Sequence, residues 1–467
     1  MVKSRKARPS PRRSRKPKQS IPEGQGPFEV TIEAMGDRGD GLARHPETGR
    51  TVYVAGAFPG DHISAKPQGN QADGLRATLL DILSPSPDRL PAPLPCPHVG
   101  SCGGCPLMGW APNAQARDKR ERILKALKRH GFSKGELETK LPETLSLPGQ
   151  GQRQRLSVGL SSTGAVGFHT RRDTTIVDVP NCLLPVPRLA EDLAGLRRVW
   201  HQLAAATSTA LPTGTALLTS SDSGTDILMT LAKDPDLAVR EALGRFAAER
   251  DLARLTLSID GLQEPLAHRR PVHHRLAGTA ITFPPGPFLQ PSAIGQSSLI
   301  EHVQRALEGL TPGIGLDLFC GLGTFTLPLA AQGWRMQAID IDPASISHLS
   351  QAGVAGLSAQ SQNLFSDPLP PDMLSRCDGI VFDPPRAGAA LVCETIAALP
   401  MASGPKRVVA VSCNPATFAR DAKILRQGGW ELVWLAPIDQ FPWTPHVELV
   451  ARFDRTTKGQ KARTISL

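Results

Sequence analysis

The chain has 467 residues, which is too long for one typical core and predicts two or three domains. Hydrophobic residues make up 40% of it, enough for folded domains, and no apolar run is long enough to span a membrane. We therefore expect a cytoplasmic protein with no membrane partner. The formal net charge of +10 comes mainly from residues 1–19, which hold nine Lys or Arg and no acidic residue.

The basic residues belong to a segment, residues 1–25, that is rich in Pro and Ser and almost free of apolar side chains. Such a segment has no face to bury, so we expect it to be disordered. A basic arm that binds nucleic acid and a solvated tail that aids solubility are equally consistent with it. It lacks the apolar stripe of a transit peptide, which argues against a targeting role.

Residues 26–84 contain about five short apolar strands separated by turn residues, which predicts a small OB-like β-barrel. Barrels of this kind often bind oligonucleotides by stacking bases on aromatic side chains. The aromatic candidates here are Phe28, Tyr53 and Phe58. Because they are so few, a purely structural barrel remains the alternative.

Three cysteines open the next region, residues 85–285, for which we expect an α+β central domain. Cys96, Cys102 and Cys105 are separated by five and two residues, and the glycines between them let the backbone wrap closely around a ligand. Cys182 is the next cysteine along the chain. Eight cysteines without a signal peptide predict reduced metal ligands rather than disulfides, and the spacing is compatible with zinc or an iron–sulfur cluster.

Residues 114–131 carry many Lys and Arg residues on an apolar helical pattern, which predicts an amphipathic basic helix. Its charged residues are expected to be solvated, with contact to nucleic acid as the alternative, and its apolar face to pack on the C-terminal domain. The chain from residue 150 to 285 mixes strands and helices without a repeat or a recognisable catalytic motif.

Residues 286–467 alternate strands and helices, which predicts a doubly wound α/β sheet of Rossmann type. The first strand ends at a glycine turn, Cys320-Gly-Leu-Gly323, and the second ends at Asp340. A glycine turn lets a ligand approach the backbone, and an acid in this position accepts hydrogen bonds from ribose hydroxyls, so we expect an adenosine cofactor. The missing third glycine argues against NAD.

Cys413 is a candidate nucleophile, because it ends an apolar strand around Val408–Val411 and precedes Asn414-Pro415, which cannot extend the strand. Ligands of open α/β sheets bind at the carboxyl ends of the strands, so this thiol is expected to face a site. A buried, inert thiol is the alternative. Asp383 ends an earlier strand before two prolines, which hold it toward the same cleft.

Several motifs, together with the cysteines and the barrel, are similar to those of the RNA uracil-5-methyltransferase family. They are Phe288-Leu-Gln290, Asp317-Leu-Phe-Cys-Gly-Leu-Gly323, Asp383-Pro-Pro-Arg386, Ser412-Cys-Asn-Pro415 and His446-Val-Glu448. The resemblance covers nearly the whole chain after the tail. It implies a TRAM domain at residues 26–84 and an S-adenosylmethionine (SAM)-dependent methyltransferase domain at residues 286–467. The implied ligands of a 4Fe-4S cluster, favoured over zinc, are Cys96, Cys102, Cys105 and Cys182.

The resemblance also implies the residues that contact SAM as the methyl donor. These are Gln290, Phe319, Thr324, Asp340, Asn363 and Asp383. The chain has Thr324 and Ser292 where family members commonly carry Asn, a departure that affects the cofactor contacts rather than the reaction. The cluster is expected to be structural, because methyl transfer to an activated carbon needs no electron.

Cys413 and Glu448 carry the chemistry that the resemblance implies. Carbon 5 of uracil is a poor nucleophile, and attack of a thiolate on carbon 6 makes it enolate-like. After methyl transfer the proton on carbon 5 must leave, and Glu448 is the implied base. The target base must also leave its stack, so that the thiol can reach the face of the ring.

Other interpretations fit parts of the sequence. DNA cytosine-5 methylation uses the same thiol chemistry, but its nucleophile usually follows proline, whereas Ser412 precedes Cys413. Methylation of an amino group favours an aromatic residue where Arg386 stands. A non-catalytic RNA-binding factor that keeps the fold would not need Cys413, Asp383 and Glu448. The barrel and the cysteines favour 23S rRNA over tRNA as the RNA partner, and no obligate protein partner is predicted.

Overall fold

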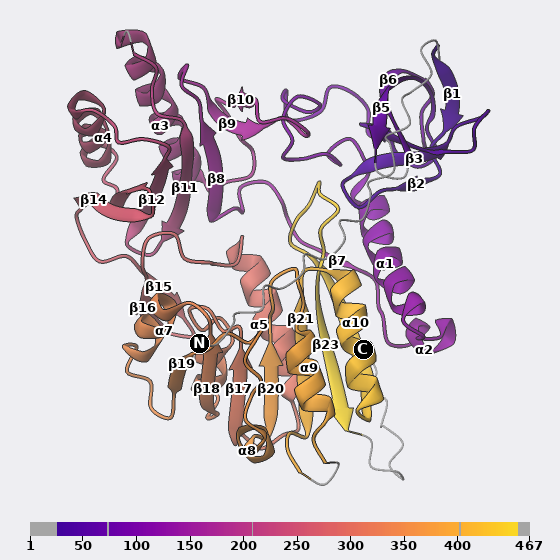
Figure 1. Ribbon diagram of the computed structural model, residues 1–467, viewed down its shortest axis with the longest axis vertical. Helices are drawn as coiled ribbons and strands as arrows, with labels where there is room; N and C mark the ends of the chain where they lie inside the picture. The colour runs from indigo at the N-terminus through magenta and orange to yellow at the C-terminus, as the bar shows by residue number, and fades with distance from the viewer. Residues whose placement is uncertain (1–25, 72–73, 208, 401–402, 456–467) are drawn as a thin grey trace, which may run out of the picture. The chain divides into compact units, whose positions relative to one another are not determined.

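The computed structural model describes residues 26–71, 74–207, 209–400 and 403–455. The chain divides into two compact units, Met1–Arg89 and Leu90–Leu467 (Figure 1). The expected disordered tail, residues 1–25, lies outside the described residues. Among the described helices, none is long and apolar enough to cross a membrane.

The first unit is a six-stranded sheet with the order β1-β5-β6-β4-β3-β2. Its strands are β1 (Phe28–Thr31), β2 (Ala34–Met35), β3 (Asp40–Arg44), β4 (Thr51–Ala55), β5 (His62–Gln71) and β6 (Gly74–Ser84). Alternating side chains such as Val30, Val52, Val54 and Ile63 fill a small apolar core. The sheet curls around this core, which is compatible with the expected barrel (Figure 1).

Phe58, one of the three aromatic residues expected to be available for base stacking, is part of the interior of this unit. Its exposed fraction is 3%, and the guanidinium carbon of Arg89 lies 4.6 Å from the centre of its ring. Two hydrogen bonds of 3.0 and 2.6 Å to the carboxylate of Asp61 hold Arg89 in place. The expectation is therefore wrong for Phe58, and Phe28 and Tyr53 remain as candidates.

The second unit contains a seven-stranded sheet in the order β10-β9-β8-β11-β12-β13-β14. Its elements are β8 (Arg155–Leu160), β9 (Val166–His169), β10 (Ile176–Asp178), α3 (Pro187–Ala206), β11 (Gly214–Ser221), β12 (Gly224–Leu231), α4 (Leu237–Glu249), β13 (Arg254–Ile259) and β14 (Leu262–His268). Helices α3 and α4 pack on this sheet through a core that contains Leu193, Trp200 and Phe246. A hairpin of β15 (His273–Leu276) and β16 (Thr279–Thr282) follows.

The C-terminal part of this unit is an eight-stranded sheet in the order β19-β18-β17-β20-β21-β23-β22-β7. Its strands are β7 (Leu145–Ser146), β17 (Ile314–Leu318), β18 (Arg335–Asp340), β19 (Ser358–Ser361), β20 (Gly379–Phe382), β21 (Arg407–Ser412), β22 (Trp430–Asp439) and β23 (Glu448–Arg455). Strands β17 to β21 pair in parallel, whereas β23 is antiparallel to β21 and β22. The predicted α/β sheet is confirmed, with a reversed strand near one end.

Helices cover both faces of this sheet (Figure 1). One face carries α1 (Pro112–Arg129), α2 (Lys134–Glu138), α8 (Pro371–Arg376), α9 (Ala390–Ala397) and α10 (Pro415–Gln427), and the other carries α5 (Ala293–Leu307), α6 (Thr326–Ala331) and α7 (Pro343–Ser350). Ile123, Leu124 and Leu127 of α1 join the core of the sheet. The expectation that the charged residues of this helix are solvated is wrong for Lys119, which is fully buried against Asp439.

Gly428 lies where the end of α10 approaches α9 closely. A Cβ atom at Gly428 would lie 2.5 Å from the Cα and Cβ atoms of Ala397, and the φ angle of −81° is one that any residue adopts. We expect Gly428→Ala to lower the free energy of unfolding by about 1–3 kcal/mol, measured by urea denaturation, because overpacking forces the two helices apart.

Gly244→Ala in α4 is the matched control, because a Cβ atom there would meet open space. We expect this change to leave the free energy of unfolding unchanged or to raise it by about 0.5–1 kcal/mol. A loss for Gly428→Ala no larger than the effect of the control would contradict the close approach of the two helices.

Candidate active site

Strand β21 places Cys413 at the carboxyl end of the sheet. All six residues of β21 are buried, and Asn414 begins α10, since its Oδ1 accepts a hydrogen bond of 3.1 Å from the N–H of Ala416. The Nδ2 of Asn414 donates to the carbonyl of Arg386 at 2.9 Å. Cys413, itself half-buried, is therefore fixed between a buried strand, a capped helix and the turn that follows β20.

The pairing of β21 with β23 brings Glu448 beside Cys413. Ser412 is paired with Leu449 in this antiparallel ladder, so the residue after Ser412 and the residue before Leu449 are neighbours. Glu448 is buried, with an exposed fraction of 6%. Cys413 and Glu448, which come from two different sequence motifs, are therefore neighbours in the fold.

Burial shifts the pKa values of three ionisable groups in this site toward their neutral forms. It raises the pKa of Cys413 to about 12, and the negative charges of Glu448 and Asp383 add to this rise. Burial also raises the pKa of Asp383 to about 7 and that of Glu448 to about 8, where the charge of Asp383 contributes. The free site thus holds a protonated thiol next to carboxyl groups that titrate near neutral pH, as proton transfer requires.

Two amide side chains connect these carboxyl groups. Gln290 Nε2 donates to Asp383 Oδ2 at 3.4 Å, and Gln440 Nε2 donates to Gln290 Oε1 at 3.0 Å. A hydrogen bond from Gln440 also lowers the pKa of Glu448, against the effect of burial. Gln290 is an expected site residue, whereas Gln440 carries no signal in the sequence that separates it from a surface glutamine.

The glycine turn after β17 lies against the end of β18. Asp340 Oδ2 accepts a hydrogen bond of 2.9 Å from the N–H of Gly321, and Oδ1 accepts one of 2.9 Å from Asp342. Phe319, Gly321 and Gly323 have φ angles of 62°, 52° and 86°, a left-handed conformation that glycine adopts freely and phenylalanine adopts under strain. A Cβ atom at Gly321 would meet no other atom within 4 Å, so the backbone of the turn is open to close approach at this position.

The other expected cofactor contacts lie along the same edge. Asn363 follows β19, and its Oδ1 accepts a hydrogen bond of 3.0 Å from the N–H of Phe365. The ring centre of Phe365 lies 5.4 Å from that of Phe319, and Thr324 is half-buried in the glycine turn. Ile341 and Phe365 are exposed by 53% and 45%. Their exposure is a property of the fold that the motifs did not indicate.

Arg386 lies against His446, with Nη2 at 3.0 Å from Nε2. Burial and the positive charge of Arg386 lower the pKa of His446 to about 4. The imidazole is therefore neutral at pH 7 and accepts a hydrogen bond from the guanidinium group. The charge of Arg386 also lowers the pKa values of Cys413 and Glu448, so this arginine favours the thiolate and the carboxylate forms of the two side chains.

Arg153 and Arg155 lie close to aromatic rings near the start of the central sheet. The guanidinium carbon of Arg153 is 5.0 Å from the ring centre of Phe441, and that of Arg155 is 6.0 Å from the ring centre of Phe288. Phe288 is 65% exposed, and Nε of Arg155 is buried without a hydrogen-bond partner among the described residues. Phe441 is half-buried. An exposed ring beside a guanidinium group, as at Phe288, is typical of sites that bind single-stranded nucleic acid.

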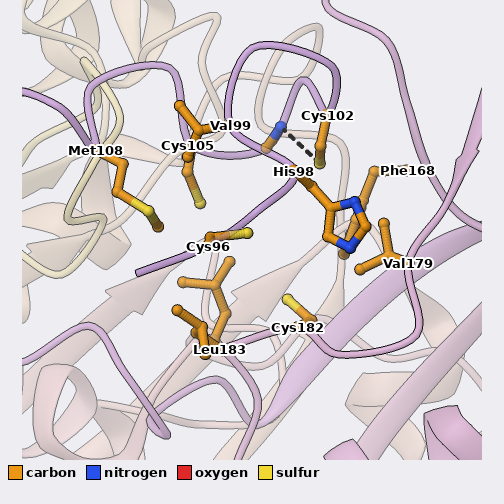
Figure 2. Close-up of a pocket in the computed structure, with 12 residues that line it drawn as sticks. Cys96, His98, Val99, Cys102, Cys105, Met108, Phe168, Val179, Cys182 and Leu183 are labelled. Atoms are coloured by element: carbon orange, nitrogen blue, oxygen red, sulfur yellow. Dashed lines mark hydrogen bonds between the residues drawn. The ribbon is translucent and has the colours of Figure 1, made fainter. Parts of the chain in front are cut away.

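The four cysteines expected as ligands line one cavity (Figure 2). Three of them precede α1, and Cys182 lies between β10 and α3. Burial, with a contribution from the neighbouring thiols, raises the pKa of Cys105 to about 12 and that of Cys182 to about 11. Four thiolates around one cavity repel one another unless a cationic group lies between them, so these residues fit a metal group.

The arrangement differs from the one that a single metal ion requires. Within the part of the chain that the structure describes, no three His, Cys, Asp or Glu side chains are placed to hold one ion. A tetrahedral zinc site holds each thiolate about 2.3 Å from the metal, which draws the four sulfur atoms tightly together. The remaining cysteines outside the active site, Cys320, Cys377 and Cys393, are buried in the C-terminal part of the molecule.

Comparison with known proteins agrees with this geometry. The model of the tRNA (uracil-5-)-methyltransferase family matches residues 373–455. A protein of Caulobacter vibrioides described as an uncharacterized RNA methyltransferase is 34% identical over 442 residues, which cover 91% of this chain and 100% of that protein. The chain belongs to the RNA uracil-5-methyltransferase family. The resemblance that the sequence motifs indicated is confirmed.

Two further members of this RNA uracil-5-methyltransferase group are similar along most of their length. The 23S rRNA (uracil(1939)-C(5))-methyltransferase RlmD of Aeromonas salmonicida is 28% identical over 439 residues, which cover 92% of this chain and 96% of that protein. The crystal structure of Pyrococcus abyssi tRNA (uracil-54, C5)-methyltransferase in complex with S-adenosyl-L-homocysteine has a TM-score of 0.70 and 21% identity, and the match covers 91% of this chain and 100% of that one. The Pyrococcus abyssi protein therefore shares the fold described above.

The raised pKa of Glu448 predicts a pH-dependent effect of Glu448→Gln on stability. Between the ordinary pKa of 4.5 and the folded-state value of about 8, the folded protein keeps a proton that the unfolded protein releases. This group therefore lowers the free energy of unfolding progressively as the pH rises through that window. We expect Glu448→Gln to gain about 1–3 kcal/mol relative to wild type between pH 5 and pH 8.5, measured by urea denaturation.

Glu241→Gln, at an exposed carboxylate of α4, is the control and should change stability by a similar small amount at both pH values. A gain for Glu448→Gln that does not depend on pH would contradict the raised pKa.

Proposed function

We propose that the chain uses SAM to methylate carbon 5 of a uridine in RNA, through a covalent bond between Cys413 Sγ and carbon 6 of the base. The observation that carries this proposal is the pairing of β21 with β23, which brings Cys413 and Glu448 together at the carboxyl edge of the sheet. A thiol beside a buried carboxyl group supplies both the nucleophile and the base that the reaction needs.

Each residue has one task in this mechanism. Cys413 adds to carbon 6, and the electron pair of the 5,6 double bond moves to carbon 5 and the neighbouring carbonyl oxygen. SAM, when bound, supplies the methyl group that carbon 5 takes up. Glu448 then removes the proton from carbon 5, which re-forms the double bond and expels the thiolate of Cys413. The base gains one methyl group and loses one proton.

The thiol of Cys413 must lose its proton before it attacks, because the thiolate is the nucleophile. With a pKa of about 12 it is protonated in the free site. Asp383, with a pKa of about 7, takes up that proton, which leaves Glu448 free to remove the proton from carbon 5 in the later step. Arg386, whose charge lowers the pKa of Cys413, then stabilises the thiolate.

In this proposal SAM lies along the carboxyl edge of β17 to β20. Asp340 and the glycine turn fit the ribose and the close backbone approach of an adenosine cofactor. Ile341 and Phe365 offer exposed apolar surface for the adenine ring. The other proposed contacts are Gln290, Phe319, Thr324, Asn363 and Asp383.

The proposed RNA is 23S rRNA, and tRNA is the second candidate. The RlmD protein of Aeromonas salmonicida, similar over nearly its whole length, supports 23S rRNA, whereas the family model and the Pyrococcus abyssi structure carry tRNA in their names. The pairs Arg153–Phe441 and Arg155–Phe288 support binding of an unstacked segment with the target base turned out. Residues 26–84 would add RNA contacts as a TRAM-type barrel in a cytoplasmic enzyme.

The four cysteines are proposed to hold a 4Fe-4S cluster. Four thiols that line one cavity support a bound metal group, and the family resemblance favours the cluster over zinc. A cluster bound there would join the loop before α1 to the segment before α3. Its role is structural, because no step of the methyl transfer requires an electron.

Anaerobic incubation with methyl-labelled SAM and separate pools of unmodified 23S rRNA and tRNA, followed by nucleoside analysis, tests the proposed reaction. We expect labelled 5-methyluridine in the 23S rRNA pool. Glu448→Gln should accumulate a covalent protein–RNA adduct and lose about 10²- to 10⁴-fold in turnover, since the carbon 5 proton stays in place. Cys413→Ala should form no adduct.

Cys393→Ala, at a buried thiol away from the site, is the control and should keep wild-type turnover. Label in the tRNA pool alone would favour the second candidate. No labelled 5-methyluridine in either pool, from protein with its full iron content, would contradict the proposed reaction. Adduct in Cys413→Ala at the level of Glu448→Gln would contradict the proposed roles.

Cys105→Ser tests the proposed cluster. We expect wild-type protein purified without oxygen to hold about four iron and four sulfide ions per chain, and the variant to hold less than half of that, because one of four thiolate ligands is lost. Cys377→Ser is the control, since its side chain donates to the carbonyl of Leu374 and serine keeps this bond. One zinc ion per chain in place of iron would refute the cluster.

A further inference from the structure

Residues 440–447, which we call the β22–β23 loop, lead directly into Glu448. The first residue of the loop, Gln440, is 3% exposed. Its amide donates to Gln290 at 3.0 Å and also forms the hydrogen bond to Glu448. Ile438, two residues before Gln440, pairs with Glu448 across β22 and β23, so the backbone around Gln440 fixes the start of β23 and, with it, Glu448.

Lys119 of α1 holds the residues on both sides of Gln440. Its Nζ lies 2.5 Å from Asp439 Oδ2 and donates to the carbonyl of Phe441 at 3.2 Å. The N–H of Phe441 in turn donates to Asp439 Oδ1 at 3.0 Å. The side chains of Lys119 and Asp439 are exposed by only 0% and 5%, and a buried ion pair tolerates little change in geometry.

Gln115, one turn earlier on α1, holds the β22–β23 loop at a second point. Its Oε1 accepts a hydrogen bond of 3.0 Å from the N–H of Trp443, and its Nε2 donates to the carbonyls of Leu107 and Trp110 at 3.1 and 2.7 Å. The N–H of Leu107 donates to the carbonyl of Trp443 at 2.9 Å. These bonds stabilise a left-handed φ of 64° at Trp443, which is unusual for a bulky residue.

We propose that Lys119 is a positioning residue for the reaction: with Gln115 it fixes the β22–β23 loop so that Gln440 holds Glu448 toward carbon 5 of the base. This inference rests on the proposed function of Glu448. Under this inference α1 acts on the step in which the carbon 5 proton is removed. The helix does so although it precedes Phe441 by more than half of the chain. The inference also joins the cysteine loop to the site, because Leu107 follows Cys105 by two residues.

The role of Lys119 has a signature in the pH profile. The hydrogen bond from Gln440 lowers the pKa of Glu448, so displacement of Gln440 raises that pKa and moves the removal of the proton to higher pH. The other ionisable groups that face Glu448 are Asp383, Arg386 and Cys413. Asp383 directly follows β20, Arg386 lies in the turn after it, and Cys413 directly follows β21, so none of the three is part of α1 or of the β22–β23 loop. Arg386 contacts the loop through His446, whose imidazole lies 3.0 Å from its guanidinium group.

The test compares Lys119→Met with Lys125→Met, which changes an exposed lysine of the same helix. Rates of 5-methyluridine formation and the amount of covalent adduct are measured from pH 6.5 to 9.5. We expect Lys119→Met to lose about 10²-fold in kcat at pH 7 with KM for SAM unchanged, since a small misplacement of a catalytic group has an effect of this size. It should accumulate adduct and recover part of its kcat at pH 9.5, whereas Lys125→Met should match wild type.

A second variant separates positioning from folding. Lys119→Met leaves the Asp439 carboxylate buried without its partner, whereas Lys119→Met/Asp439→Asn removes both charges and still lacks the bond to Phe441. We expect the double variant to fold and to show the same shifted pH profile. Hydrogen–deuterium exchange of residues 439–448 should be about 10-fold faster in both variants than in wild type or Lys125→Met.

Wild-type kcat, pH profile and exchange in the double variant would overturn the inference. A loss of kcat that is equal at every pH and brings no adduct would assign Lys119 to folding alone, and would overturn it as well. If Glu448→Gln itself forms no adduct, the proposed role of Glu448 fails instead, and the exchange rates still decide whether Lys119 holds the loop.

Discussion

The reversal of β23 is the constraint on which the whole site depends. In a parallel sheet all strands end at one edge and begin at the other. Because β23 is antiparallel to β21, its first residue, Glu448, lies at the edge where β21 ends. A nucleophile that follows one strand and a base that begins another can meet only through such a reversal. The loop that turns the chain back must therefore be held as firmly as the strands themselves.

Burial gives the resulting pair its chemical character. A solvated carboxylate is ionised at neutral pH and takes up protons poorly, whereas Glu448 and Asp383 have pKa values of about 8 and 7. The same burial keeps Cys413 protonated, so the thiol stays in its unreactive form until its proton moves to a neighbouring group. A hydrogen bond from Gln290 to Asp383 lowers the cost of burying this carboxyl group, and Gln440 holds Gln290 in position by donating to its amide oxygen.

Local patterns predict the strands, the glycine turn and the nucleophile, because each of these depends on residues that are close in sequence. Contacts between distant residues leave no such pattern. Lys119 lies on a helix whose charged residues were expected in solvent, yet it is buried because Asp439 lies opposite it. Phe58 is covered in the same way by Arg89. Gln440 becomes a site residue only through the fold of its loop.

The position of α1 along the chain has a consequence for protein synthesis. This helix packs against α10 and β22, and β7 extends the edge of the sheet next to β22. Both N-terminal elements leave the ribosome long before the strands that cover them have been translated. The apolar face of α1 therefore lacks its native partners α10 and β22 until they have been translated. Until then a chaperone or an early collapsed intermediate would shield it from water. The sheet is completed only when β22 and β23 emerge.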